Sequence, residues 1–294
     1  MKKFLLGALG LLALTLAGCS SNQLTTNKSS YHPTALTAVV KGNAKSKTVN
    51  YQIDGGRKQK AEVNGGTYFF QVPTATKDQQ VKITAGTAHK TVSVKHVTAL
   101  GNYKKFAAKY NQMVIATHLP AKVQKQLASA QKTQAATKKK LAALAQTNPT
   151  AAAAAVQKQQ AAAKQLQAQM ATAKKAAKDE LLPTDTTAGV KNLISTKAVT
   201  VRGNVQARKL MGLALITPTK QMKTKTGQKD FGTTFALLGG SLNAKPKYVI
   251  KKFEKVLKDA KKNSSSTTTK TIRSNGVRFN TGFSTDHLYI YMTK

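Results

Sequence analysis

Cys19 is the residue to which the sequence assigns the most definite chemistry. It is the only cysteine of the chain, and it directly follows Leu16-Ala17-Gly18. The chain begins with Lys2 and Lys3, and an apolar stretch of about 13 residues then runs from Phe4 to Leu16. A helix that spans a membrane needs roughly 20 apolar residues, so this stretch predicts an export signal that is cleaved.

The four residues Leu16-Ala17-Gly18-Cys19 resemble the lipobox of bacterial lipoproteins. The resemblance implies that residues 1–18 are a signal peptide, that cleavage makes Cys19 the N-terminus, and that its thiol carries a diacylglyceryl group. Two acyl chains bind a membrane stably, whereas one chain binds only reversibly. We therefore expect attachment to membrane lipid through Cys19, on the extracellular face of the cell membrane. The alternative is an ordinary secretory signal with a chance cysteine. The basic start, the apolar stretch and the small residues before Cys19 occur together in the expected order, which argues against this alternative.

Lysine is the second residue type whose number and spacing indicate chemistry. The chain holds 48 basic and 10 acidic residues, and only five of the basic residues are arginine. Lysine is a compact, strongly hydrated cation, whereas arginine suits bidentate recognition, so the composition favours a diffuse positive potential. The 100 residues between Asp78 and Asp179 contain 17 lysines and no acidic residue.

In a cytoplasmic protein this charge would predict nucleic-acid binding, but export removes that partner. We expect instead that the lysines bind anionic envelope polymers such as teichoic acids, or anionic lipid headgroups. The alternative is that the charge only keeps an exposed protein soluble. The lysines of the predicted polyanion site are Lys122, Lys125, Lys132, Lys138, Lys139, Lys140, Lys158, Lys164, Lys174, Lys175 and Lys178.

Other residues that could carry chemistry are scattered. Most acidic residues stand singly, so nothing indicates the paired carboxylates of a glycosidase. His89 and His96 lack the close spacing of a metal pair, and neither His32 nor His118 is expected to have a carboxylate nearby. The pair Asp286-His287 is interpreted as part of a turn and not as catalytic residues.

Three further features point away from an enzyme. Asp179-Glu180 is interpreted as part of a linker, and Gly239-Gly240-Ser241 lacks the strand-turn-helix setting of a nucleophile elbow. Tryptophan, the commonest sugar-stacking side chain, is absent. With its single cysteine lipidated, the chain would hold no thiolate ligand. We therefore expect no catalytic residue, no cofactor and no metal.

The sequence patterns around these residues predict a multidomain protein. Residues 19–34 are small and polar, and they predict a flexible tether. Residues 35–98 predict an all-β sandwich with short strands between glycine-rich turns. The expected strands are Leu36–Lys41, Thr48–Ile53, Gln59–Val63, Thr67–Val72, Gln80–Ala85 and Lys90–Lys95.

This β region resembles the small immunoglobulin-like modules of bacterial surface proteins. The matching residues are Val40-Lys41-Gly42, Asn64-Gly65-Gly66-Thr67-Tyr68-Phe69 and Val72-Pro73. The resemblance implies a spacer or adhesion module.

Residues 101–182 predict a central Ala/Lys-rich antiparallel helical hairpin. A first helix is expected near Tyr103–Thr117, Pro120 opens a second, and Asn148 with Pro149 caps and starts a third. The expected seam between the two long helices is Leu127, Ala130, Gln134, Thr137, Leu141 and Leu144 against Val156, Gln159, Ala163, Leu166, Met170, Ala173 and Ala177. Alanine buries little area and the lysines repel one another, so we expect a marginal element that a polyanion would stiffen; the alternative is a plain solvated spacer.

Residues 189–294 predict an α+β domain with an antiparallel sheet covered by two helices, in the order β-β-α-α-β-β-β. The strongest turn signal of the chain is Asn275-Gly276, which favours a type I′ hairpin because both positions tolerate a positive φ.

The whole chain resembles uncharacterised surface lipoproteins of lactobacilli and related Gram-positive bacteria. The residues that carry this are Leu16-Ala17-Gly18-Cys19, Ala99-Leu100-Gly101-Asn102-Tyr103, the Ala/Lys/Gln helices, Phe231-Gly232-Thr233-Thr234-Phe235-Ala236-Leu237-Leu238 and Leu288-Tyr289-Ile290-Tyr291. Our first hypothesis is a non-enzymatic envelope-binding or adhesion lipoprotein. The alternatives are a solute-capturing lipoprotein of a transporter, and an envelope enzyme or inhibitor, which would need a convergent polar pocket in the C-terminal domain.

Overall fold

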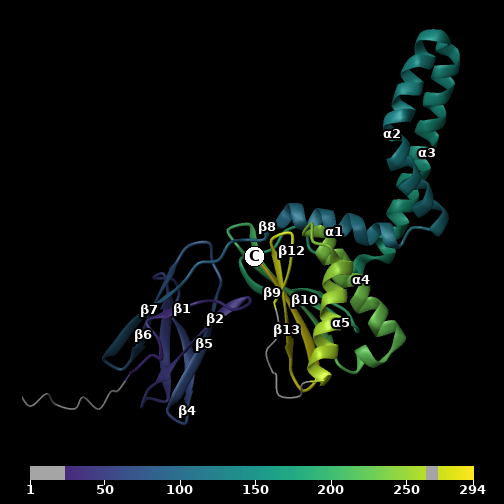
Figure 1. Cartoon of the computed structure of the whole chain (residues 1–294). Helices are drawn as coiled ribbons and strands as arrows, with labels where there is room; N and C mark the ends of the chain where they lie inside the picture. Colours follow the sequence, from purple (N-terminus) through teal and green to yellow (C-terminus); the bar gives the residue numbers. More distant parts are fainter. Residues whose placement is uncertain (1–23, 263–270) are drawn as a thin grey trace, which may run out of the picture. The chain divides into compact units, whose positions relative to one another are not determined.

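The computed structural model describes residues 24–262 and 271–294 (Figure 1). Cys19 and the expected signal peptide lie outside the described residues. The chain divides into two compact units: residues up to 30 with 40–70 and 80–93 form the first, and residues 31–39, 71–79 and 94–294 form the second. In the described part no helix is long and apolar enough to cross a membrane.

Seven strands near the N-terminus form one hydrogen-bonded sheet in the order β1-β7-β6-β3-β4-β5-β2. Along most strands buried and exposed residues alternate, the pattern of a sheet with one face in a core. The expected strands are confirmed to within three residues at each end, and β1 was not expected. The strands are β1 Ser30–Tyr31, β2 Thr37–Asn43, β3 Thr48–Ile53, β4 Gln59–Asn64, β5 Thr67–Pro73, β6 Gln79–Ala85 and β7 Ala88–Val94.

The described part of the chain begins inside the segment expected to be a flexible tether. Leu24 is 5% exposed and bridges to Ala44, and the Thr25 N–H donates to the Asn43 carbonyl at 2.9 Å. The Tyr68 hydroxyl donates to the Thr25 carbonyl at 2.8 Å. A side chain at Gly42 would collide with that carbonyl and with Tyr68, so the close approach requires glycine there. These backbone contacts order a segment whose polar composition indicated none.

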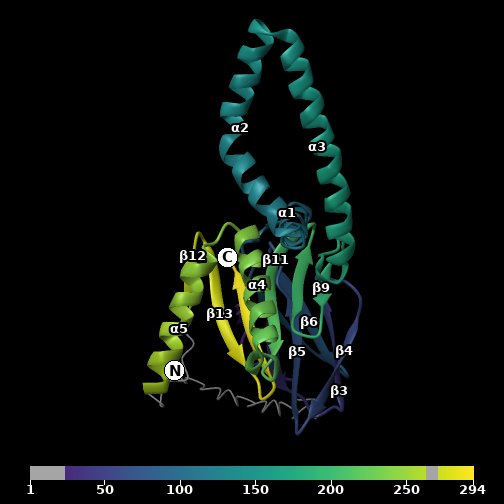
Figure 2. The same cartoon turned by 90° about the vertical axis from the view of Figure 1, so that its right-hand side faces the viewer.

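Three helices follow the sheet: α1 Tyr103–Thr117, α2 Ala121–Thr147 and α3 Pro149–Ala176. The Asn148 side chain accepts a hydrogen bond from the Ala151 N–H at 3.0 Å, with Pro149 at the first helical position, so the expected start of the third helix is confirmed. Asn148 is also the only residue between α2 and α3, which we call the α2–α3 helix pair (Figure 2).

The α2–α3 helix pair is packed along only part of the expected seam. Leu119, Val123 and Ala173 are buried together, with Leu127, Leu166 and Met170 against them. Ala152 is buried near the turn. Between these two ends the described residues of 128–140 and 156–165 are all exposed. Alanine and glutamine at these positions are too small or too polar to close the seam.

The C-terminal sheet is antiparallel, with the strand order β12-β13-β14-β11-β10-β9 and the short strand β8, Gly101–Asn102, paired to β11. Asn275 and Gly276 have φ of 49° and 77°, which confirms the tight hairpin between β12 and β13. The expected order is confirmed, with β9 as an additional strand before it. The strands are β9 Gly189–Ser195, β10 Thr200–Gln206, β11 Lys209–Pro218, β12 Ile272–Ser274, β13 Val277–Phe283 and β14 His287–Thr293.

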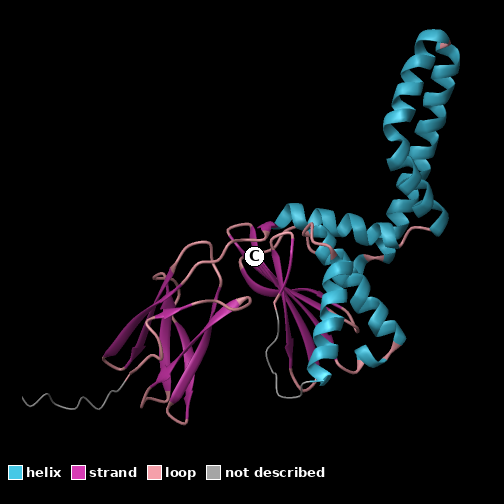
Figure 3. Ribbon diagram, viewed as in Figure 1, coloured by secondary structure: helices cyan, strands magenta, loops and turns pink. Residues whose placement is uncertain are grey.

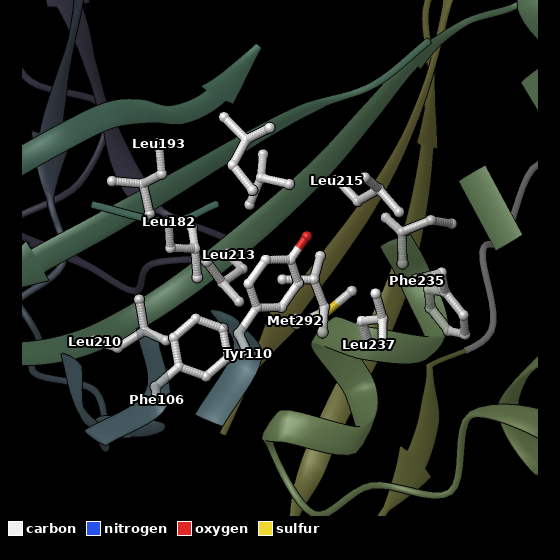
Figure 4. Close-up of a cluster of buried hydrophobic side chains, with 14 of the residues drawn as sticks. Phe106, Tyr110, Leu182, Leu193, Leu210, Leu213, Leu215, Phe235, Leu237 and Met292 are labelled. Atoms are coloured by element: carbon white, nitrogen blue, oxygen red, sulfur yellow. The ribbon is translucent and has the colours of Figure 1, made fainter. Parts of the chain in front are cut away.

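Helices α4 Lys225–Ser241 and α5 Pro246–Lys262 pack on this sheet, as expected, but so does α1 (Figures 1 and 3). Phe106 and Tyr110 of α1 are buried with Leu213 of β11 and Phe235 of α4 in one core (Figure 4). Helix α4 continues through Gly239 and Gly240 and ends at Ser241. A Cβ at Gly240 would lie 3.0 Å from the Met113 methyl group of α1, so the glycine permits the two helices to approach.

Candidate polyanion-binding surface

All eleven lysines of the predicted polyanion site are exposed. Six lie on α2, four on α3, and Lys178 begins the short 3-10 helix η1, Lys178–Glu180. An exposed ammonium group keeps its hydration and its long-range field, so each of these side chains is available to an approaching anion.

Five of the α2 lysines share one face of their helix. At 3.6 residues per turn they fall within about 100° of one another and extend over about 27 Å along the helix axis. We call this set the lysine stripe: Lys122, Lys125, Lys132, Lys139 and Lys140.

The lysine stripe lies on the side of α2 opposite to its contact with α3. Val123 and Leu127, which pack against α3, are centred about 180° away from the stripe around the helix. On α3, Lys164 and Lys175 likewise point away from Leu166 and Ala173, which face α2. Packing of the helix pair therefore directs most of the charge outward.

No carboxylate neutralises the stripe in the described part of the chain. The ion pairs there involve Lys95, His96, His118 and His287, and none involves an α2 or α3 lysine. Neither long helix contains an acidic residue. Like charges along one helix repel one another, so the stripe carries uncompensated positive charge.

The base of the helix pair is fixed to α1 by apolar packing and by a side-chain hydrogen bond. Ile115 of α1 packs against the cluster of Leu119, Val123 and Ala173. The Gln124 side chain donates to the Leu119 carbonyl at 2.7 Å, which satisfies one backbone group at the start of α2. The helix pair is thus anchored to α1 at its base, at the start of α2 and the end of α3.

His118 has a carboxylate partner, contrary to our expectation. Its Nε2 lies 3.1 Å from Oε1 of Glu180, 62 residues away in the sequence. The interpretation of Asp179-Glu180 as plain linker is therefore wrong for Glu180. The pairing arises because α1 and η1 meet at the base of the α2–α3 helix pair, a contact that no local pattern in the sequence indicates.

Two other histidines also lie beside carboxylates: His96, after β7, beside Asp78, and His287, the first residue of β14, beside Asp286. Hydrogen bonds from the Lys95 ammonium and from the His96 backbone and ring hold the pKa of Asp78 well below its usual range. Asp286, which bonds to His287 and Ser284, also has a lowered pKa. The Ser284 hydroxyl accepts from the His287 N–H at 3.1 Å, so Asp286-His287 forms the expected turn. Among the described residues no group of three or more potential ligands could hold a metal ion.

Comparisons with known proteins add little to this geometry. No protein-family model and no curated protein matches the chain. One solved structure, the FMN-binding beta-glucuronidase from Facaelibacterium prausnitzii L2-6, is similar over 26% of this chain and 12% of its own, with 16% identity and a TM-score of 0.22. A likeness this small carries no argument about fold or activity.

Proposed function

We propose that the protein is a non-enzymatic lipoprotein of the cell envelope that binds anionic wall polymers such as teichoic acids. The observation that carries the proposal is the lysine stripe, which faces away from α3 and has no carboxylate partner in the described residues. Cys19 would hold the chain at the extracellular face of the membrane through its lipid. The β-sheet domain, an immunoglobulin-like sandwich in this proposal, would act as a spacer or adhesion module.

The chemistry of the stripe suits a flexible chain of phosphates better than a single compact anion. Five ammonium groups spread over about 27 Å can each meet a successive phosphate of a repeating polymer. Lysine provides point charges without a fixed geometry, so it tolerates variation in the polymer. In this proposal α2 and α3 form an antiparallel hairpin that the bound polymer stiffens, because binding removes the repulsion between the lysines.

The test compares binding of the full-length protein, purified in detergent, to cell walls with and without teichoic acid. We expect affinity for the intact walls to fall steeply as salt rises, since exposed charges are screened over about 8 Å at physiological ionic strength. A variant with all five stripe lysines replaced by glutamine should bind at least about tenfold more weakly.

The matched control removes the same charge from the β-sheet domain. Lys58, Lys60, Lys77, Lys82 and Lys90 are exposed, and their replacement by glutamine should leave binding within about twofold of the unmodified protein if the stripe is the site. Equal losses in the two variants would show that only net charge matters. Equal binding to walls stripped of teichoic acid would overturn the choice of polymer.

A further inference from the structure

A cavity of about 400 Å³ with a mixed polar and apolar lining opens in the second unit, near the base of the α2–α3 helix pair. Its walls come from the end of α1, from η1, from β9 and the turn after it, and from α4. The residues that line it are Tyr110, Thr117, His118, Glu180, Ile194, Thr196, Val199, Lys229, Asp230, Thr233 and Thr234. The size lies within the range of small-molecule sites.

Tyr110 brings an unpartnered hydroxyl to this cavity. The residue is 1% exposed, and its phenol oxygen points away from α1 (Figure 4). Tyr103, the other buried tyrosine of α1, donates to the Pro183 carbonyl at 2.7 Å, whereas the Tyr110 hydroxyl has no such bond within the described chain. The ring of Tyr110 is buried, but its hydroxyl is accessible at the cavity wall, where it can donate a hydrogen bond to a ligand atom.

The Tyr110 hydroxyl remains a donor at neutral pH. Burial, and then the nearby Glu180 carboxylate, raise the pKa of Tyr110. A protonated phenol at the wall can donate to a carboxylate or carbonyl oxygen of a bound molecule.

The walls carry uncompensated charges of both signs. Lys229 and Asp230 are neighbours on α4, where successive side chains point about 100° apart, and they form no ion pair with each other or with another described residue. Glu180 has one carboxylate oxygen beside His118 and its other oxygen free of a hydrogen bond among the described groups. The α4 wall of the cavity therefore offers both an ammonium group and a carboxylate, and η1 offers a second carboxylate.

The remaining lining completes a site for a small polar molecule with an aliphatic part. Thr233 and Thr234 of α4 lie one turn from Lys229 and Asp230, so their hydroxyls share that wall. Ile194 and Val199 form an apolar patch of the lining.

We propose that this cavity binds a small zwitterion of the amino-acid class, an amino acid or a dipeptide. Its carboxylate meets Lys229 and the Tyr110 hydroxyl, its ammonium group meets Asp230 and Glu180, and its side chain lies on Ile194 and Val199. A neutral sugar would leave the charges of Lys229 and Asp230 unpaired and would find no exposed aromatic face to stack on. This site is separate from the lysine stripe and does not rest on the polymer-binding proposal.

Calorimetric titration of the full-length protein in detergent with each of the 20 standard amino acids, and with alanyl-alanine, tests the site. We expect at least one probe to bind with a dissociation constant of about 1 mM or lower. Amidation of that probe's carboxylate or acetylation of its amine should each weaken binding at least about tenfold, because each removes one charge pair.

Three variants and a control test which side chain binds which group of the zwitterion. Lys229→Gln should weaken the zwitterion but not its amide, and Asp230→Asn should weaken the zwitterion but not its N-acetyl form. Tyr110→Phe should weaken binding and leave the melting temperature unchanged. Lys225→Gln, on the same helix but outside the cavity, should bind as the unmodified protein does.

Three results would overturn the proposal. The first is that no probe binds, and the second is that Lys229→Gln and Asp230→Asn bind the best probe as tightly as the unmodified protein. The third is that glucose or N-acetylglucosamine binds where the zwitterions do not. The five-lysine stripe variant should keep its affinity for the probe, which separates failure of this site from failure of the polymer-binding proposal.

Discussion

At the scale of single residues, the two buried tyrosines of α1 differ in the partner of their hydroxyl. The Tyr103 hydroxyl bonds to the protein, whereas our proposal assigns the Tyr110 hydroxyl to a ligand. Tyr103 and Tyr110 are both almost fully buried, and both rings pack in the core beneath α1. The Tyr103 hydroxyl joins α1 to the Pro183 carbonyl, and Asn111 of α1 adds two hydrogen bonds of 2.8 Å to the backbone of Leu182. The Tyr110 hydroxyl contributes to no such contact.

This difference predicts opposite results for two otherwise identical substitutions. Tyr103→Phe should lower the free energy of unfolding by about 1–2 kcal/mol, because a hydrogen bond is lost and a carbonyl loses its donor. Tyr110→Phe should change it by less than about 0.5 kcal/mol, since no protein hydrogen bond is removed. Urea unfolding followed by circular dichroism measures both values. Equal losses in the two variants would contradict the assignment of the Tyr110 hydroxyl to a ligand.

At the scale of elements, the α2–α3 helix pair combines strong local signals with weak tertiary packing. The start of α3 follows from a capping side chain and a proline at the first helical position, both of which act within four residues. The seam, by contrast, is closed only near its ends. The exact pairing of two such helices depends on a few apolar contacts, and the repeat of alanine in the sequence does not distinguish one register from another.

The Asn148 cap of α3 should therefore contribute measurably to the stability of the helix pair. Asn148→Ala removes the acceptor for the Ala151 N–H, and we expect a cost of about 1 kcal/mol. Amides in the first turn of α3 should exchange about fivefold faster in hydrogen-exchange mass spectrometry. Thr147→Ala, one residue earlier, is the control and should leave exchange nearly unchanged, because its exposed hydroxyl only donates back to the Ala143 carbonyl. A cap variant that exchanges like the control would show that packing alone sets the start of α3.

At the scale of the whole molecule, the net charge and the proposed lipid anchor do not depend on the fold. The net charge is +38 at pH 7, and it falls to +36 once Lys2 and Lys3 are removed with the expected signal peptide. A cationic protein held at an anionic surface is attracted to that surface over the whole of its exposed area. In our proposal, the lipid on Cys19 decides which surface the protein meets.

The anchor itself can be tested without reference to the fold. Expressed in a Gram-positive host with a clickable palmitate analogue, the protein should become labelled, and the Cys19→Ser variant should lose essentially all label because it lacks the only thiol. Mass spectrometry of the purified protein should find an N-terminus at Cys19 carrying a diacylglyceryl group. Label that persists in Cys19→Ser, or a mature N-terminus elsewhere, would rule out the lipobox interpretation.

The sequence by itself determined the features that depend on neighbouring residues: most strands of both sheets, the turn at Asn275-Gly276, the cap at Asn148 and the exposure of the helix lysines. Each follows from a short-range rule, such as alternation along a strand, a positive φ or an orphan N–H. Only the tertiary structure decided that α1 belongs to the C-terminal core, that His118 meets Glu180, and that Tyr110 lies beside Lys229 and Asp230. These residues are 62 and 119 or more positions apart, and they meet because burial of apolar surface brings α1, η1 and α4 together, which no local pattern records.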